Sequence, residues 1–281
     1  MLICKTKYFD MKLYRFSLLI LLLIISCNTN PFTDKKTLAI VPNSKLIPMS
    51  FKQYDEVLKE ENIITGTKDA RRIEKIGNRI ANAAEKWLKE KGYEDYTKDY
   101  KWEFSLIKKD MINAWAMPGG KVAFYTGILP VAQDDNGIAT IMGHEVAHAL
   151  ANHGQQRMSA SQIQQAVGTA GALAIGSENQ KEQQIFQVAY GLGSKVGAML
   201  PFSRKHESEA DKIGLTIMAI AGYNPDKAYQ LWERMSKASG GKKPPELLST
   251  HPSNKTRIKN LKKWSPDAKQ KAKKLGVTTF E

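Results

Sequence analysis

Two histidines and a glutamate stand at a spacing that suits metal-assisted hydrolysis. His144, Glu145 and His148 form the pattern H-E-x-x-H. Residues four apart on an α-helix share one face, so both imidazoles can reach one ion at about 2.0–2.1 Å, and Glu145 is rotated about 100° to stand beside it. Zinc lowers the pKa of a bound water to about 7, and Glu145 is placed to take its proton. The pattern predicts a hydrolytic zinc site; the alternative is two helix histidines with an incidental glutamate.

A third protein ligand must come from another part of the chain. Gly154 stands where a histidine six residues after His148 would be required. His153 points almost opposite to His144 on the same helix, so it is assigned to packing or to a surface hydrogen bond.

Carboxylates within residues 204–211 are candidates to complete the site. Glu207 and Asp211 are one helical turn apart, so one can bind the metal while the other accepts a hydrogen bond from a ligating imidazole. Glu209 is turned roughly 200° away from Glu207 and cannot share that role. His206 is a weaker candidate. The alternative for the segment is an acidic helix face that is simply solvated.

A helical frame with a small sheet is predicted to hold these groups. Apolar periodicity and alternation predict helices at 69–91, 136–152, 204–221 and 225–239, and strands at 100–107 and 121–125. Asp134 and Asp135 are candidate caps of the central helix, Gly154 is its expected stop, and 118–120 form a turn. The last basic segment is expected to form two short helices split at Ser265-Pro266. The fold class is α+β, mostly helical, with the sheet beside the central helix.

Two segments rich in Ala, Gly and Gln, at 157–175 and 183–199, follow the central helix. Neither is apolar enough to cross a membrane. They are expected to form either a loose helical hairpin packed on the core or a mobile cover over a cleft, and packing is the favoured interpretation.

Residues 1–26 have the pattern of a bacterial lipoprotein signal peptide. Basic residues precede an apolar run at 18–25, which at eight residues is far shorter than the ~20 needed to span a bilayer. The string Ile24-Ile25-Ser26-Cys27 resembles a lipobox, which implies that Cys27 is acylated and that Met11 is a possible true start. An ordinary signal or a short anchor with an incidental cysteine is the alternative. Residues 27–50 are then a lipidated N-terminus and tether, with a short strand expected near 37–41.

The composition of the whole chain limits its partners. With 281 residues, 42% hydrophobic and 25% charged, it is a globular chain whose residues 51–281 are expected to form one domain. The formal net charge of +14 is spread over helical faces, and no motif interleaves basic residues with stacking aromatic ones. This excludes nucleic acid and leaves a solvated face or a surface for anionic lipid.

Four motifs in order resemble a known family of zinc metallopeptidases. They are 113–120 (Asn-Ala-Trp-Ala-Met-Pro-Gly-Gly), 143–148 continuing to His153-Gly154, 202–204 with 207–211, and 250–252 followed by Arg257. Over residues 27–265 the chain is similar to the family that contains the CAAX prenyl proteases, the membrane protease HtpX and soluble periplasmic lipoprotein proteases. It lacks the transmembrane helices around the catalytic core of the multispanning members, so the periplasmic lipoprotein type fits better.

The resemblance implies a zincin-like (gluzincin) metalloprotease domain that binds one zinc ion per chain. By the family pattern, His144, His148 and Glu207 are the zinc ligands. Asp211 is implied as the partner that supports these ligands.

Two further residues take implied roles near the metal. Some family members carry at the position of His251 a histidine that can approach the zinc and regulate access; the alternative is a helix-start residue before Pro252. Arg257 is expected either to stabilise a developing oxyanion or to pair with an acidic residue.

The segment from Asn113 and the strand after the 118–120 turn resemble the sheet edge that receives substrate backbone, which implies Asn113, Ala114, Val122 and Phe124 as substrate-binding residues. Backbone pairing of this kind makes little sequence demand. The resulting hypothesis is a zinc endopeptidase of the bacterial cell envelope, lipid-anchored and facing the periplasm, which cleaves unfolded or misassembled envelope proteins. The alternative is a non-catalytic lipoprotein chaperone or scaffold, and the open metal site argues against it.

Overall fold

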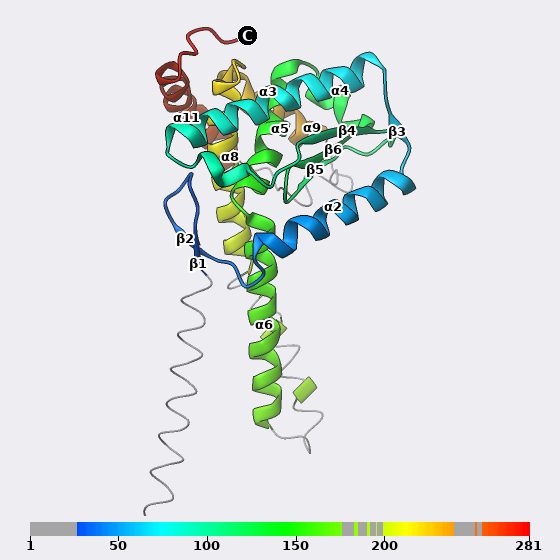
Figure 1. Cartoon of the computed structure of the whole chain (residues 1–281), viewed down its shortest axis with the longest axis vertical. Coiled ribbons are helices and arrows are strands. Elements are labelled where there is room, and N and C mark those ends of the chain that lie inside the picture. The colour runs from blue at the N-terminus through cyan, green and yellow to red at the C-terminus, as the bar shows by residue number, and fades with distance from the viewer. Residues whose placement is uncertain are drawn as a thin grey trace, which may run out of the picture.

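The helix that carries the H-E-x-x-H pattern, α5 (Asp135–Leu150), lies at the centre of the fold (Figure 1). The computed structural model describes residues 27–175, 199–238, 251 and 255–281, with isolated positions between 183 and 195. Asp134 begins α5 because its side chain accepts a hydrogen bond from the Gly137 backbone N–H. Every residue of α5 from Gly137 onward is buried. The helix ends before Asn152, whose φ of 55° breaks the helical path, so Gly154 is not the stop.

A four-stranded sheet packs beside α5. Its strands lie in the order β3 (Ile63–Ile64), β4 (Glu103–Ile107), β6 (Lys121–Tyr125) and β5 (Ala114–Met117). β4 and β6 run parallel, whereas β5 runs antiparallel to β6. The predicted strands at 100–107 and 121–125 are confirmed. So is the turn at 118–120, where Gly119 and Gly120 adopt φ of 87° and 91°, a region that favours glycine.

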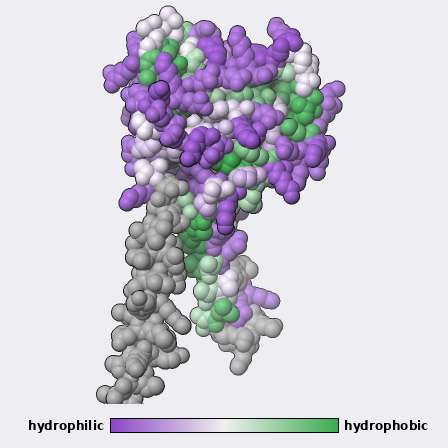
Figure 2. Space-filling model, viewed as in Figure 1, coloured by the Kyte–Doolittle hydropathy of each residue, from purple (hydrophilic) through white to green (hydrophobic). Residues whose placement is uncertain are grey.

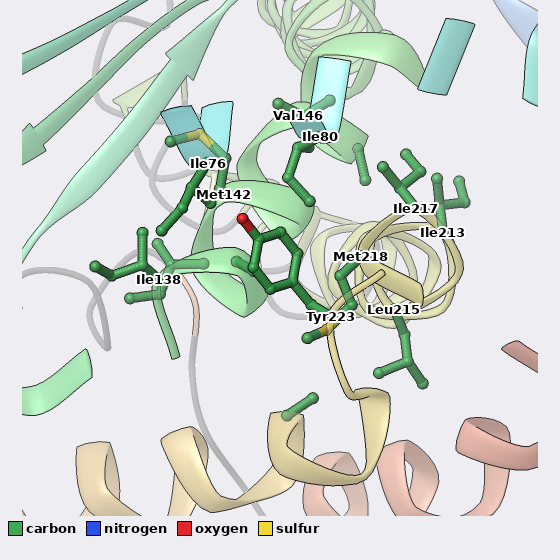
Figure 3. Packing of buried hydrophobic residues seen from close by; sticks show 14 of the residues in the cluster. Ile76, Ile80, Ile138, Met142, Val146, Ile213, Leu215, Ile217, Met218 and Tyr223 are labelled. Carbon is green, nitrogen blue, oxygen red and sulfur yellow. The ribbon is translucent and has the colours of Figure 1, made fainter. Parts of the chain in front are cut away.

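Two long helices pack against α5 and against each other. α3 (Lys68–Glu90) confirms the helix predicted at 69–91, and Thr67 caps it by accepting a hydrogen bond from Ala70 N–H. α8 (Leu200–Ile220) confirms the helix predicted at 204–221 and begins earlier, around Pro201. Figure 3 shows their shared core, which contains Ile76, Ile80, Ile138, Met142, Val146, Ile213, Leu215, Ile217, Met218 and Tyr223.

The backbones of α5 and α8 touch at a pair of glycines. A Cβ added to Gly143 would lie 2.7 Å from the Gly214 carbonyl oxygen, and one added to Gly214 would lie 2.7 Å from the Gly143 carbonyl carbon. Any side chain at either position would push the helices apart. Gly143 directly precedes His144, so this close approach is made at the level of the predicted metal site.

A further helix, α2 (Asn43–Glu60), covers the face of the sheet that α5 does not. Tyr54 donates a hydrogen bond from its hydroxyl to Ser105 Oγ at 2.7 Å and is fully buried. The predicted tether over 27–50 is therefore wrong in part: α2 begins at Asn43 because Leu46 and Ile47 are buried. Upstream, β1 (Cys27–Thr29) and β2 (Lys36–Leu38) form a hairpin, close to the short strand expected near 37–41.

The last basic segment forms one helix, α11 (Lys255–Lys274), with Pro266 in its interior. The prediction of two short helices is wrong because the buried Leu261, Ala268 and Ala272 hold both halves against the core. That packing outweighs the backbone hydrogen bond that proline removes. The helix predicted at 225–239 is found as a short 3-10 turn, Pro225–Lys227, followed by α9 (Ala228–Ala238). The α+β class is confirmed.

The helix after α5, α6 (His153–Ile175), leaves the body of the molecule (Figure 1). Its first turns are buried against the body, but its far half is not packed on the core, with Val167 51% and Leu173 71% exposed. Figure 2 shows hydrophobic surface on this projecting helix. The favoured packed hairpin is therefore wrong for α6, and most of the second predicted segment, 183–199, lies outside the described residues.

Two predictions concern membranes. Within the described ranges, every helix is too short or too polar to span a bilayer. The predicted signal peptide at 1–26 lies outside the described residues, so it stays a prediction together with acylation of Cys27.

Candidate metal centre

Side chains from α5 and α8 converge on one point. His144 Nε2 lies 3.1 Å from His148 Nε2 and 3.3 Å from Glu207 Oε2, and His148 Nε2 lies 3.3 Å from Glu207 Oε1. One ligand atom from each of these residues and from His251 lies within 4.8 Å of all the others. The structure therefore brings the three predicted ligands together, from two helices whose backbones touch at Gly143 and Gly214.

The donor set fits the zinc ion that the motif predicts. Two imidazole nitrogens and one carboxylate are a usual protein ligand set of catalytic zinc. Glu145 Oε1 is buried and makes no hydrogen bond within the described residues, and His251 Nε2 lies 3.6 Å from it. Buried carboxylate oxygens are normally paired, so an oxygen of this kind beside the cluster is explained by a cation between the side chains.

The charge balance of the cluster also favours a cation. Burial raises the pKa of Glu207, but hydrogen bonds from the surrounding imidazoles outweigh it and hold that pKa far below its ordinary value. Burial and Arg257 lower the pKa of His144, yet Asp211 and Glu207 outweigh them and raise it to about 9. Burial keeps the pKa of His148 well below its ordinary value, so this ligand is neutral. The Glu207 carboxylate therefore stays ionised and the His148 imidazole stays neutral, which are the protonation states in which these groups bind a metal.

Asp211 and Arg257 hold His144 from behind. His144 Nδ1 lies 3.0 Å from Asp211 Oδ1, which also accepts a 2.6 Å hydrogen bond from Arg257 Nη2. The guanidinium of Arg257 lies 3.4 Å from the centre of the Trp232 ring, and Trp232 in turn contacts His144 edge-on at 5.8 Å between ring centres. Of the two expected roles of Arg257, the structure contains the ion pair with an acidic residue.

His251 reaches into the cluster from a separate segment. Its Nδ1 lies 2.9 Å from Glu207 Oε2 and 3.1 Å from His144 Nε2, and its Nε2 lies 3.6 Å from Glu145 Oε1. Arg257 Nη1 donates to the His251 backbone carbonyl at 3.3 Å. The side chain therefore stands where a fourth ligand would bind, beside the predicted general base.

His153 lies behind His148 and is fully buried. Its Nδ1 is 2.9 Å from His148 Nδ1, and its Nε2 is 3.0 Å from Glu209 Oε2. His206 stacks on the His153 ring with centres 4.2 Å apart and contacts Gln156. His153, Glu209 and His206 are not among the four residues of the metal cluster. The prediction of packing or a surface hydrogen bond for His153 misses its contact with His148. That prediction treats 144–153 as one straight helix, whereas the chain turns at Asn152 and His153 begins a second helix.

The predicted substrate edge is displaced by one strand. β6 pairs with β4 on one side and β5 on the other, so it cannot accept a substrate backbone. Val122 and Phe124 are fully buried in the core, and the prediction that they bind substrate is wrong. The strand at the sheet edge is β5, which begins with the predicted Ala114 and follows Asn113. In the described part of the chain, no strand pairs with its outer edge.

A model of Peptidase family M48 matches residues 68–265, which is more than half of the chain and contains the whole cluster. The chain belongs to peptidase family M48. In this family member, the matched range begins at α3 and extends into α11, so it takes in strands β4, β5 and β6, both ligand-bearing helices, His251 and Arg257.

Curated relatives of this M48 chain include mitochondrial and bacterial proteases. It is 38% identical over 174 residues to the mitochondrial metalloendopeptidase OMA1 of Schizosaccharomyces pombe, which covers 62% of this chain and 49% of that protein. Human mitochondrial metalloendopeptidase OMA1 is 30% identical over 173 residues, which cover 59% of this chain and 33% of the human protein. The beta-barrel assembly-enhancing protease of Escherichia coli is 28% identical over 159 residues, which cover 55% of this chain and 32% of that protease. The chain therefore spans about half or less of the length of these relatives.

Two features of this M48 site escape sequence reasoning. Trp232 has no pattern that separates it from a core aromatic residue, although it supports both His144 and Arg257. The β5 strand is four residues long and lies between two glycines and a loop, so alternation is too short to detect there. Its sequence, however, lies within the 113–120 motif, which is the signal that could have located it.

Proposed function

We propose that this protein is a zinc endopeptidase that hydrolyses peptide bonds of unfolded or misassembled envelope proteins. The observation that carries the proposal is the meeting of His144, His148 and Glu207 around one point, with the buried Glu145 carboxylate beside it. The relatives named as metalloendopeptidases belong to the same family and support this reading.

The residues of the site divide the work of hydrolysis. When bound, zinc polarises the scissile carbonyl and makes water acidic enough to lose a proton near neutral pH. Glu145 is the general base that removes this proton and the general acid that returns it to the leaving nitrogen. Asp211 keeps His144 in the tautomer with its proton on Nδ1, so that Nε2 faces the cluster. Arg257 holds Asp211 in place and closes the site from the side of α11.

The substrate binds as an added strand on β5. An extended peptide gains backbone hydrogen bonds from the outer edge of β5 whatever its sequence. β5 also contacts α5, which holds two of the ligands and Glu145. This mode suits unfolded chains, because a folded protein rarely offers a free extended segment.

The envelope location rests on the N-terminal pattern and on one relative. An apolar run at 18–25 precedes Cys27, and acylation of that cysteine would tie the domain to a membrane facing the periplasm. The Escherichia coli relative carries beta-barrel assembly in its name. Mass spectrometry of protein purified from its own cell should find acyl chains on an N-terminal Cys27, whereas an unmodified Cys27 would contradict a lipid anchor.

The hydrolytic proposal is tested with Glu145→Gln. The variant should keep one zinc ion per chain and its melting temperature, but lose about 10²–10⁴-fold in the rate of casein cleavage. Glu74→Gln, on the exposed side of α3, is the matched control and should cleave normally. Wild-type protein that binds zinc yet never cleaves unfolded protein would instead favour the non-catalytic chaperone.

His251 is proposed to close the metal site at rest. Its ring occupies the space that a substrate carbonyl needs, because it lies within 3.1 Å of His144 Nε2. His251→Ala should therefore raise the rate of peptide cleavage several-fold while zinc content stays at one per chain. A lower zinc content together with a lower rate would make His251 a structural ligand and end the proposal.

A further inference from the structure

A groove lined by methionine lies between α2 and α6 at the end of β5. Its volume is about 580 Å³, within the range of roughly 300–1,000 Å³ that is usual for ligand sites. Met49 of α2, Met158 of α6 and Met117 of β5 line it together with Leu46 and Pro118. Three elements far apart in the sequence thus present the same flexible side chain to one space.

These methionines are unusually open to solvent. Met49 is 63% exposed and Met158 is 39% exposed. Exposed apolar side chains that gather around one groove, rather than standing singly, are typical of a ligand-binding groove. Methionine is unbranched and adapts to many shapes, so a groove of this kind accepts varied apolar side chains.

The groove continues the open edge of β5. Side chains alternate along a strand: Ala114 and Ala116 face the core around α5, whereas Trp115 packs with Ala123 and Tyr125 on the side of α2. Met117 shares the side of Trp115. A chain added to the outer edge of β5 would therefore send every second side chain toward α2 and the groove.

We propose that this groove binds apolar side chains of an extended, unfolded polypeptide whose backbone pairs with β5. The proposal rests on the proposed endopeptidase function and adds a substrate class, namely chains with apolar residues at alternate positions. Lys52, Gln53 and Glu56 also line the groove, so its rim carries both signs of charge and does not select strongly for charge.

The experiment compares two substituted pairs, one that lines the groove and one that lies outside it. Met49→Gln with Met158→Gln keeps side-chain length but removes apolar surface from the groove. Val167→Gln with Leu173→Gln does the same on the part of α6 outside the groove. Each is assayed with two fluorogenic peptides that share one cleavage sequence, one extended by alternate leucines and one by alternate serines.

The groove variant should raise KM for the leucine peptide about tenfold. Its kcat for that peptide, and its KM and kcat for the serine peptide, should stay unchanged. The control pair should change KM and kcat for neither peptide. Equal KM values for the groove variant and wild type, in protein that does cleave, would overturn the groove while leaving the endopeptidase intact. Loss of self-association in the groove variant with unchanged KM would assign the groove to a second copy and likewise overturn the proposal.

We also infer that His153 is a positioning residue that fixes His148 for the metal. If His148 binds through Nε2, its proton lies on Nδ1 and is donated to His153 Nδ1 at 2.9 Å. His153 then carries its own proton on Nε2 and donates it to Glu209 Oε2 at 3.0 Å. The two ligating imidazoles are thus held differently, His144 directly by Asp211 and His148 through His153 by Glu209.

The test measures zinc affinity by competition with a chelator and the visible absorption of the cobalt-substituted protein. His153→Phe removes the acceptor and should weaken zinc binding about 10–100-fold and alter the cobalt spectrum. His153→Asn offers an oxygen near the place of Nδ1 and should restore most of the zinc affinity and most of the wild-type cobalt spectrum. His206→Phe keeps a ring stacked at His153 and serves as the packing control. Equal zinc affinity in His153→Phe and His153→Asn would overturn the inference.

Discussion

α5 and α6 follow one another with only two residues between them, yet they have opposite surroundings. α5 is enclosed by α3, α8, α9 and β5, and all its residues from Gly137 onward are buried. α6 begins at His153 inside the same core and then runs out of it, so that its last turns are exposed. Both helices are poor in charge and rich in small residues. Neighbours therefore decide burial here, and the sequence of each helix alone does not.

The difference separates two tasks. The buried helix holds two predicted ligands and the proposed general base away from bulk water, where electrostatic interactions are stronger. The exposed helix contributes one ring behind His148 at its start and Met158 to the groove one turn later. Substitutions in α5 are therefore expected to affect stability and metal binding, and substitutions in the far half of α6 to affect neither.

A pair of isoleucines tests the contrast with the largest expected effect. Ile141 of α5 is 1% exposed and Ile163 of α6 is 38% exposed. Ile141→Ala leaves a cavity in the core and should lower the free energy of unfolding by about 2–5 kcal/mol. Ile163→Ala should stay within about 0.5 kcal/mol. Urea unfolding of both variants measures the difference, and equal losses would remove the contrast between the helices.

A pair of glycines gives smaller effects on stability, and the two substitutions are expected to act in opposite directions. Gly214→Ala inserts a methyl group between the backbones of α8 and α5 and should cost about 1–3 kcal/mol and weaken zinc binding. A Cβ on Gly154, near the start of α6, would meet no atom within 4 Å. Gly154→Ala should therefore be neutral or stabilise by up to about 1 kcal/mol. Thermal melts and chelator competition check both; a stable Gly214→Ala with full zinc affinity contradicts the close approach.

The turn between α5 and α6, at Asn152, is expected to give the smallest effect on stability. Asn152 has φ of 55°, donates to the Tyr96 hydroxyl at 2.8 Å and accepts from Asn43 at 3.3 Å. Asn152→Gly loses these hydrogen bonds but can still adopt the positive φ, so it should lower the free energy of unfolding by about 1 kcal/mol. Asn152→Ala should cost about 1 kcal/mol more because alanine resists this conformation. Calorimetry of both variants decides, and equal melting temperatures would show that the turn is not strained.

Periodic and strongly patterned parts of the fold were predictable from the sequence. α3, α5, α8, β4 and β6 all carry apolar repeats long enough to exceed chance, and Asp134 marks the start of α5. The continuous α11 was not predictable, because Pro266 is a strong local signal for a break and only the buried face of the helix overrides it. The end of α5 was misplaced for a similar reason, since asparagine at positive φ is rarer than glycine.

The site was predictable as far as helical geometry reaches. His144, Glu145 and His148 follow from spacing along one helix. Spacing along another makes Glu207 and Asp211 candidates, but only the family resemblance implies that Glu207 is the ligand and Asp211 its partner. The meeting of the two helices follows from the Gly143–Gly214 contact, which no local pattern reports. Strand order is also non-local, which is why the sequence predicts β6, rather than β5 alone, as the open edge.

The placement of Arg257 on α11 has a consequence for the order of synthesis. A ribosome makes α5 and α8 well before Arg257, which pairs with Asp211 and stacks on Trp232. During translation, the nascent chain therefore carries its metal ligands before the group that braces them exists. The side chains that hold His144 in place are therefore complete only after α11 has been made and has packed against α8.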